Sequence, residues 1–274
     1  LAQDRPRTAA TMVQAASLGQ FRFGPEDTPW YGANFTNDGD AAAARADAER
    51  LSSGGIAALV AEGRAVLGGT KLRPFASVAE LGAQLRLLAD IRDTLDRFVP
   101  SVFDRPLGEL ITATGSRRDA NAALGGMQRR RLRKHALEYV RAGATIPDLH
   151  AALQGVQRQR KQWSRWAPDG AVPSVPTGLG ALEALHRDAL TALERIDAAL
   201  VGTDAPSLVD LPLDALQERL DELAAPSEAL DSIQERAALM STLAELELEP
   251  LVADLATRQD RKSTRLNSSH VEIS

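Results

Sequence analysis

The chain contains no cysteine, and only 4% of its 274 residues are aromatic. The lack of cysteine excludes a disulfide framework, a thiolate nucleophile and any zinc site with sulfur ligands. Because aromatic residues are scarce, the apolar 44% of the chain is mostly Ala, Leu and Val. This composition favours helices over a β-sandwich or barrel.

Long apolar runs are also missing. No segment approaches the roughly 20 apolar residues that a membrane-spanning helix needs, and the first residues do not show the basic, apolar and small-residue regions of a signal peptide. We therefore expect a cytoplasmic protein with no membrane partner. Nothing in the sequence sets its oligomeric state.

Both ends of the sequence suggest a piece of a longer protein. The first residue is Leu1 rather than Met, so we expect the native chain to begin further upstream. After Gln259 the helical periodicity stops, and residues 260–274 read DRKSTRLNSSHVEIS. This string resembles translated adaptor or vector sequence found attached to unrelated proteins, and we expect it to be non-native. The alternative is a disordered polar terminus.

Apolar residues recur at helical spacing along most of the chain, and no run alternates like a strand. The two longest apolar stripes, Val78–Phe98 and Leu179–Leu200, have the pattern of a bundle or coiled-coil seam. The expected helices cover residues 4–18, 39–67, 78–98, 103–114, 117–140, 147–166, 179–200, 212–223, 226–246 and 248–257. The sequence therefore predicts an all-α fold, an antiparallel helical bundle or coiled-coil-like insertion.

The same pattern divides the chain into three parts: an N-terminal helix and aromatic loop over 1–37, a helical bundle region over 38–259, and the tail over 260–274. Within the bundle region, residues 168–178 are rich in Pro and Gly and predict a hinge between two antiparallel helices. Ser77 with Glu80 forms a capping box, and Pro106 is typical of a helix start. Gly125-Gly126 is a candidate break in its helix.

Motifs that carry chemistry are absent. The sequence has no GxxxxGK[ST] phosphate loop, no GxGxxG, no HExxH and no GxSxG. Outside the tail, His135, His150 and His186 have no partner at a metal-ligand spacing. We therefore expect this chain to hold no catalytic residue, cofactor or metal site.

Charge is unevenly distributed. Residues 115–166 hold 12 Lys and Arg against 3 Asp and Glu, whereas residues 203–259 hold 3 against 13. The densest basic segment gives the candidate nucleic-acid contacts, which are Arg129, Arg130, Arg131, Arg133 and Lys134. Two alternatives stay open: the segment pairs with the acidic C-terminal helices, or it is simply solvated.

Two aromatic features have both a binding and a structural interpretation. Trp163 and Trp166 lie near several basic residues and are candidates to stack on bases. A tryptophan at helical spacing in an aromatic-poor chain is more typical of a core anchor. The loop Pro29-Trp30-Tyr31-Gly32 is either a ligand seat or, more commonly for such loops, a plug at the end of a bundle.

Five segments, read in order, carry a resemblance to a known family. They are GPEDTPWYGA (24–33), LLADIRDTLDRFVPSVF (87–103), RRRLRK (129–134), PDLHAAL (147–153) and VPSVPTGL (172–179). Together they resemble the long helical insertion of large actinobacterial superfamily-I-type DNA helicases, also described as AAA-family ATPases. The resemblance covers about residues 18–259.

The resemblance implies a parent protein that is an ATP-dependent helicase. Its phosphate loop would lie upstream of Leu1, and its magnesium motif and arginine fingers downstream of Gln259, so ATP and Mg²⁺ are expected only in the parent. This chain would then be a non-catalytic insertion that positions DNA or a partner against the motor. Its partners would be DNA and the rest of the parent ATPase. The alternative is a helical scaffold or coiled-coil interaction module with no motor.

Overall fold

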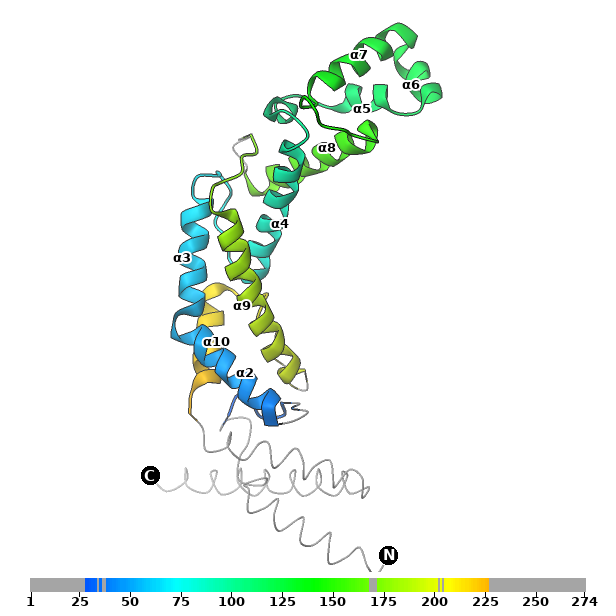
Figure 1. The fold of residues 1–274 in the computed structure, drawn as a ribbon. Coiled ribbons are helices and arrows are strands. Elements are labelled where there is room, and N and C mark those ends of the chain that lie inside the picture. Colours follow the sequence, from blue (N-terminus) through cyan, green and yellow to red (C-terminus); the bar gives the residue numbers. More distant parts are fainter. Residues whose placement is uncertain are drawn as a thin grey trace, which may run out of the picture. The chain divides into compact units, whose positions relative to one another are not determined.

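The computed structural model describes residues 28–33, 35, 38–167, 172–201, 203 and 205–226. They fall into two compact units. Unit 1 contains the described residues up to Gly55 and from Leu190 onward, and unit 2 is Ile56–Ala189. Across these residues the regular structure is helical and no strand forms, so the predicted all-α fold is confirmed (Figure 1). No helix of the described ranges is long and apolar enough to cross a membrane.

The α9 helix belongs to both units, because the boundary between them follows Ala189. Unit 2 holds α3 (Ile56–Leu67), α4 (Val78–Leu95), the 3₁₀ turn η2 (Pro100–Phe103), α5 (Gly108–Thr114), α6 (Arg117–Leu124), α7 (Gly126–Glu138), α8 (Leu149–Trp166) and the first half of α9 (Leu179–Leu200). Unit 1 holds α2 (Asp38–Arg50), the π-helical segment η1 (Leu51–Gly55), the second half of α9, and α10 (Leu213–Ala224).

The α4 helix begins where the sequence predicts it. Ser77 Oγ accepts a hydrogen bond from the Glu80 backbone N–H, and the Glu80 carboxylate accepts one from the Ala76 N–H. The first bond satisfies a donor that a helix start leaves without a partner, and the second ties the residue before the cap to the first turn. The helix ends at Leu95, earlier than expected, and Phe98 instead forms an isolated antiparallel bridge with Val140.

The apolar stripe of α4 is covered by other helices of unit 2. Val78, Leu81 and Leu88 are fully buried. On one side Gly63 of α3 lies directly against Phe75 and Leu81. Towards the C-terminal end, the Thr94 hydroxyl donates a 3.0 Å hydrogen bond to Gln159 of α8. The apolar stripe that the sequence predicts on this helix is therefore buried by contacts within the chain.

Two expected helices are divided at glycines. The helix expected over 39–67 is interrupted at η1, because Gly54 has φ 138°, which is outside the helical region. The helix expected over 117–140 is split into α6 and α7 by Gly125, whose φ is 76°. A residue without a Cβ adopts such angles at little cost, so both interruptions form where glycine permits them.

The helix expected over 103–114, with Pro106 as a typical start, begins only at Gly108, after the N-cap Leu107. Pro100, two residues after the end of the helix expected over 78–98, opens the 3₁₀ turn η2. In both segments proline fixes its own φ, but the residues after it decide whether an α-helix follows.

The aromatic loop is packed within unit 1. Trp30 is 1% exposed, and its indole Nε1 donates a 2.9 Å hydrogen bond to the carbonyl of Leu223 at the end of α10. The Phe35 ring lies 5.7 Å from it between centroids. A buried indole with its N–H bonded to a helix end has the geometry of a plug, and it offers no seat for a ligand.

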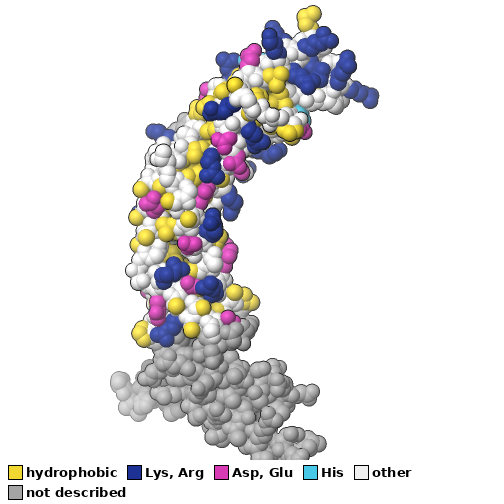
Figure 2. Space-filling view, in the orientation of Figure 1, with side chains coloured by type: hydrophobic (Ala, Val, Ile, Leu, Met, Phe, Trp, Pro, Cys, Tyr) yellow, Lys and Arg dark blue, Asp and Glu magenta, His cyan; other side chains and the backbone are white. Residues whose placement is uncertain are grey.

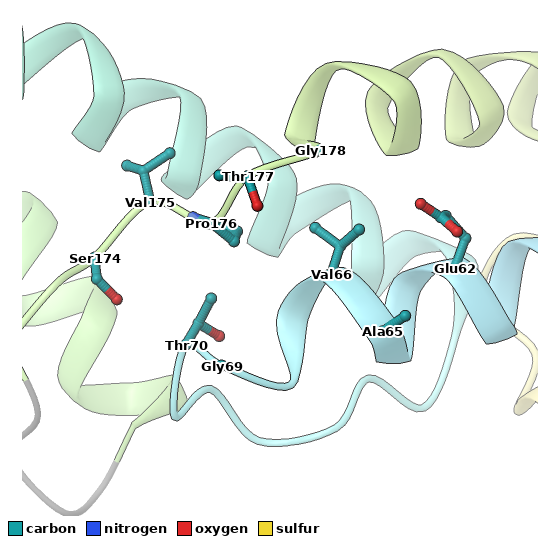
Figure 3. A pocket seen from close by; sticks show the side chains of 10 residues that line it. All are labelled: Glu62, Ala65, Val66, Gly69, Thr70, Ser174, Val175, Pro176, Thr177 and Gly178. Atoms are coloured by element: carbon teal, nitrogen blue, oxygen red, sulfur yellow. The ribbon is translucent and has the colours of Figure 1, made fainter.

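Several expectations lie outside the described residues. These are the helices over 4–18 and 248–257, the helix over 226–246 apart from its first residue, and the tail over 260–274. Of the proposed hinge over 168–178, only residues 172–178 are described. Figure 3 shows Ser174–Gly178 passing beside α3, where the two line a cavity of about 550 Å³.

Candidate nucleic-acid interface

The basic segment predicted from the sequence lies on a small helical subdomain formed by α5, α6 and α7. Each of the three helices packs against the other two. The contact faces are made of small or aliphatic residues, with Leu110 and Ala113 of α5, Ala120 of α6 and Ala136 of α7 all buried. Alanine lets helices approach closely, so the long basic side chains of α6 and α7 are left on the outside.

The α7 helix has two distinct faces. Leu132, Ala136 and the following Tyr139 lie on the packed side. Met127 stands on the opposite side and is followed at intervals of three, four and seven residues by Arg130, Arg131 and Lys134, all of them exposed. Residues at these intervals share one face of a helix. We call Met127, Arg130, Arg131 and Lys134 the outer face of α7.

The five predicted phosphate contacts are therefore not equivalent. Arg130, Arg131, Arg133 and Lys134 are exposed. Arg129 is only half-exposed, and its Nε is enclosed without a hydrogen-bond partner among the described residues. Because its Nε is enclosed, we expect Arg129 to contribute less to binding than the other four.

The positive charges of the exposed α7 side chains are little neutralised by acidic side chains of the described residues. Among the described side chains, none of Arg130, Arg131, Arg133 and Lys134 forms an ion pair. The carboxylate of Glu138, at the far end of α7, pairs at 3.0 Å with His135 instead. Charges that are not paired within the protein are available to an anionic partner.

Sequence reasoning did not single out Arg117 and Arg118, which begin α6 and are both exposed. Their helix, α6, packs against α7. Figure 2 shows Lys and Arg side chains gathered over these two helices, with apolar side chains among them. The sequence did contain a signal for these two residues, because residues 116–134 hold seven Lys and Arg against one acidic residue.

A second basic stripe lies on α8. Arg158, Lys161 and Arg165 are exposed and spaced by three and four residues, so they share one face. Arg160, on another side, is half-buried and donates to the Arg105 carbonyl. Three of the four basic residues near the tryptophans thus face solvent.

The tryptophans of α8 do not offer a stacking platform. Trp163 is 2% exposed and belongs to the core of unit 2. Trp166 is half-buried, and the guanidinium of Arg73 lies 4.7 Å from its ring centroid. The core-anchor interpretation holds for Trp163, because a buried ring cannot stack on a base.

The histidines have structural roles. His150 Nδ1 donates to the Ile111 carbonyl at 2.8 Å, and His135 lies in edge contact with the Tyr139 ring. His186 is buried on α9 with its Nε2 3.1 Å from the Val78 carbonyl. Burial lowers the pKa of His186 below its usual value, as does the nearby Arg86, while the hydrogen bond to Val78 opposes the shift.

Two observations on the described part of the chain bear on metal and phosphate binding. Its His, Asp and Glu residues form no cluster of three or more that could hold a metal ion. The cavity beside α3 is lined by Glu62 and by the hydroxyls of Thr70, Ser174 and Thr177, and no Lys or Arg reaches it (Figure 3). A carboxylate without a cation disfavours a phosphate there.

No protein-family model, curated protein or solved structure matches this chain.

Proposed function

We propose that this chain is a non-catalytic helical module that binds the phosphate backbone of nucleic acid through α6 and α7. The observation that carries the proposal is the outer face of α7, which presents Arg130, Arg131 and Lys134 to solvent in one stripe. Arg133, Arg117 and Arg118 extend the cationic surface around that stripe. Such a surface neutralises phosphates regardless of base sequence.

In the setting that the sequence resemblance suggests, the module belongs to an ATP-dependent DNA helicase-like protein. The motor, ATP and Mg²⁺ would lie in other parts of that protein, and the chain would position DNA against the motor. A helical scaffold without a motor is the competing function. It would use other surfaces and would not need exposed cations on α7.

A charge-reversal experiment separates the two functions. In the test variant Arg130→Glu, Arg131→Glu and Lys134→Glu are combined. The matched control combines Arg64→Glu, Lys71→Glu and Arg187→Glu, which are exposed positions of unit 2 away from α6 and α7. Both variants change the net charge equally, so a non-specific charge effect would appear in both.

Binding is measured by fluorescence anisotropy of a labelled duplex with the full chain at low salt. The test variant should bind at least about tenfold more weakly than the wild type, because three phosphate contacts become repulsive. The control variant should lose much less. Absence of binding by the wild type, or equal losses in the two variants, would remove the proposed function and favour the scaffold.

A further inference from the structure

The cationic outer face of α7 begins with an apolar residue. Met127 is 89% exposed, more than any other large apolar side chain of the described residues. An apolar side chain exposed at the end of a charged stripe is a surface that a partner can cover. The arginines and the lysine on the same face indicate that this partner is anionic.

The chain around Met127 leaves room for a close approach. A Cβ built on Gly125 or on Gly126 would meet nothing within 4 Å. The turn between α6 and α7 therefore presents bare backbone to solvent. Met127 is the first bulky side chain after that turn, and it stands clear of its neighbours.

Helical spacing along α7 places Met127 close to the cations of the outer face. Side chains three or four residues apart on a helix have Cβ atoms about 5–6 Å from one another. Met127 thus lies within one turn of Arg130 and Arg131, and Lys134 follows about 10 Å from Met127 along the axis. The minor groove of B-DNA is about 6 Å wide between its two phosphate strands. An apolar side chain over the groove and cations over the flanking phosphates fit these dimensions.

Single strands fit this surface less well. Proteins that bind them stack bases on aromatic side chains. Tyr139 at the end of α7 and Trp163 of α8 are buried, and the ring of the half-buried Trp166 has the Arg73 guanidinium over it. Exposed cations with an apolar side chain and without an aromatic platform are the pattern of proteins that insert Met, Leu or Phe between base steps of a duplex.

On this basis, and resting on the proposed function, we infer that Met127 inserts into the minor groove of duplex DNA while Arg130, Arg131 and Lys134 hold the flanking phosphates. The insertion partly unstacks a base step and bends the duplex. Methionine suits this role because its long thioether chain adapts to the irregular surface of a groove.

The test compares the full-length wild type with Met127→Gln and Leu137→Gln. Glutamine has about the length of methionine and a similar helix propensity, so α7 should be kept. Leu137 is the matched control because it is also exposed, at 55%, on the same helix. It lies about 15 Å further along the axis, beyond Lys134 at the opposite end of the cationic stripe.

Two signals are recorded at saturating protein on a short duplex. One is 2-aminopurine fluorescence from its central adenine positions, which reports unstacking, and the other is energy transfer between dyes at its ends, which reports bending. We expect both signals to change with the wild type and with Leu137→Gln. With Met127→Gln most of the change should be lost, while the dissociation constant rises only a few-fold.

Each other outcome contradicts the inference in an identifiable way. If the wild type saturates the duplex without a change in either signal, or if Met127→Gln gives the full change, the phosphate-binding surface stands and the insertion is wrong. Tighter binding to a single strand of equal length than to the duplex would also overturn it. If the wild type does not bind DNA, the proposed function fails first.

Discussion

The indole N–H of Trp30 donates a hydrogen bond to the carbonyl of Leu223, 193 positions further along the chain. Both residues belong to unit 1, and both are buried. The bond joins the aromatic loop near the start of the described chain to the last turn of α10. It satisfies one of the carbonyls that every helix end leaves without a partner inside the helix.

We expect Trp30 to be essential for the stability of unit 1. Trp30→Ala should lower the free energy of unfolding by about 3–5 kcal/mol, because it leaves a large cavity. Trp30→Phe keeps most of the ring but removes the donor to Leu223, at a cost of about 1–3 kcal/mol. Urea unfolding of the full chain measures both. Val201→Ala, an exposed position of the same unit, should change stability by at most about 0.5 kcal/mol.

Stability should depend on pH through His186. Its Nε2 must carry the proton that bonds the Val78 carbonyl, because a carbonyl only accepts. Charging the ring adds a proton at Nδ1 in a buried position with Arg86 nearby, and the folded-state pKa is therefore below the ordinary value of 6.5. The unfolded chain then takes up the proton more readily than the folded chain. Stability from this residue is complete above about pH 6.5 and decreases as the pH falls towards the lowered pKa.

His186→Gln isolates that contribution, since glutamine keeps an N–H donor but does not titrate. We compare urea midpoints of wild type and variant from about pH 7.5 down to pH 5, the range over which a histidine titrates. The wild type should lose more stability than the variant across this range. Parallel curves would mean that His186 does not couple folding to protons.

The close contact of α3 with the Phe75 ring makes Gly63 a sensitive position. A Cβ there would lie 2.8 Å from Phe75 Cζ, a ring that is itself buried. Gly63→Ala should therefore destabilise by about 1–3 kcal/mol through overpacking. Gly180→Ala on α9 is the matched control, because a Cβ there meets nothing within 4 Å. That change should raise the free energy of unfolding by up to about 1 kcal/mol, because alanine has a higher helix propensity than glycine. In thermal melts, Gly63→Ala should lower the melting temperature and Gly180→Ala should raise it.

Local sequence signals predicted much of the helical structure. The helix expected over 179–200 has these bounds in α9, and the cap at Ser77 starts α4 as expected. These features depend on neighbours within a few residues. The α5 start was misplaced by two residues, because Pro106 permits a helix start but does not require one.

The candidate site was predictable only in part. The sequence indicated which residues of 129–134 carry charge, but five cations in two turns cannot all face solvent once one side of the helix is packed. The structure separates Arg129 from the four exposed cations because α7 packs its Leu132 and Ala136 side against the subdomain. The contact between Trp30 and Leu223 could not be predicted, since no local pattern relates residues so far apart in the chain.

The salt dependence of duplex binding tests the phosphate-binding surface most directly. For the wild type and both triple variants, the association constant is measured from about 50 to 200 mM salt, and its logarithm is plotted against that of the salt concentration. Each phosphate contact contributes about 0.9 to the slope. Arg130→Glu/Arg131→Glu/Lys134→Glu should therefore reduce the steepness by about 2 to 3, whereas Arg64→Glu/Lys71→Glu/Arg187→Glu should keep the wild-type slope. Equal slopes for all three proteins, or no binding by the wild type at the lowest salt, would contradict the proposal.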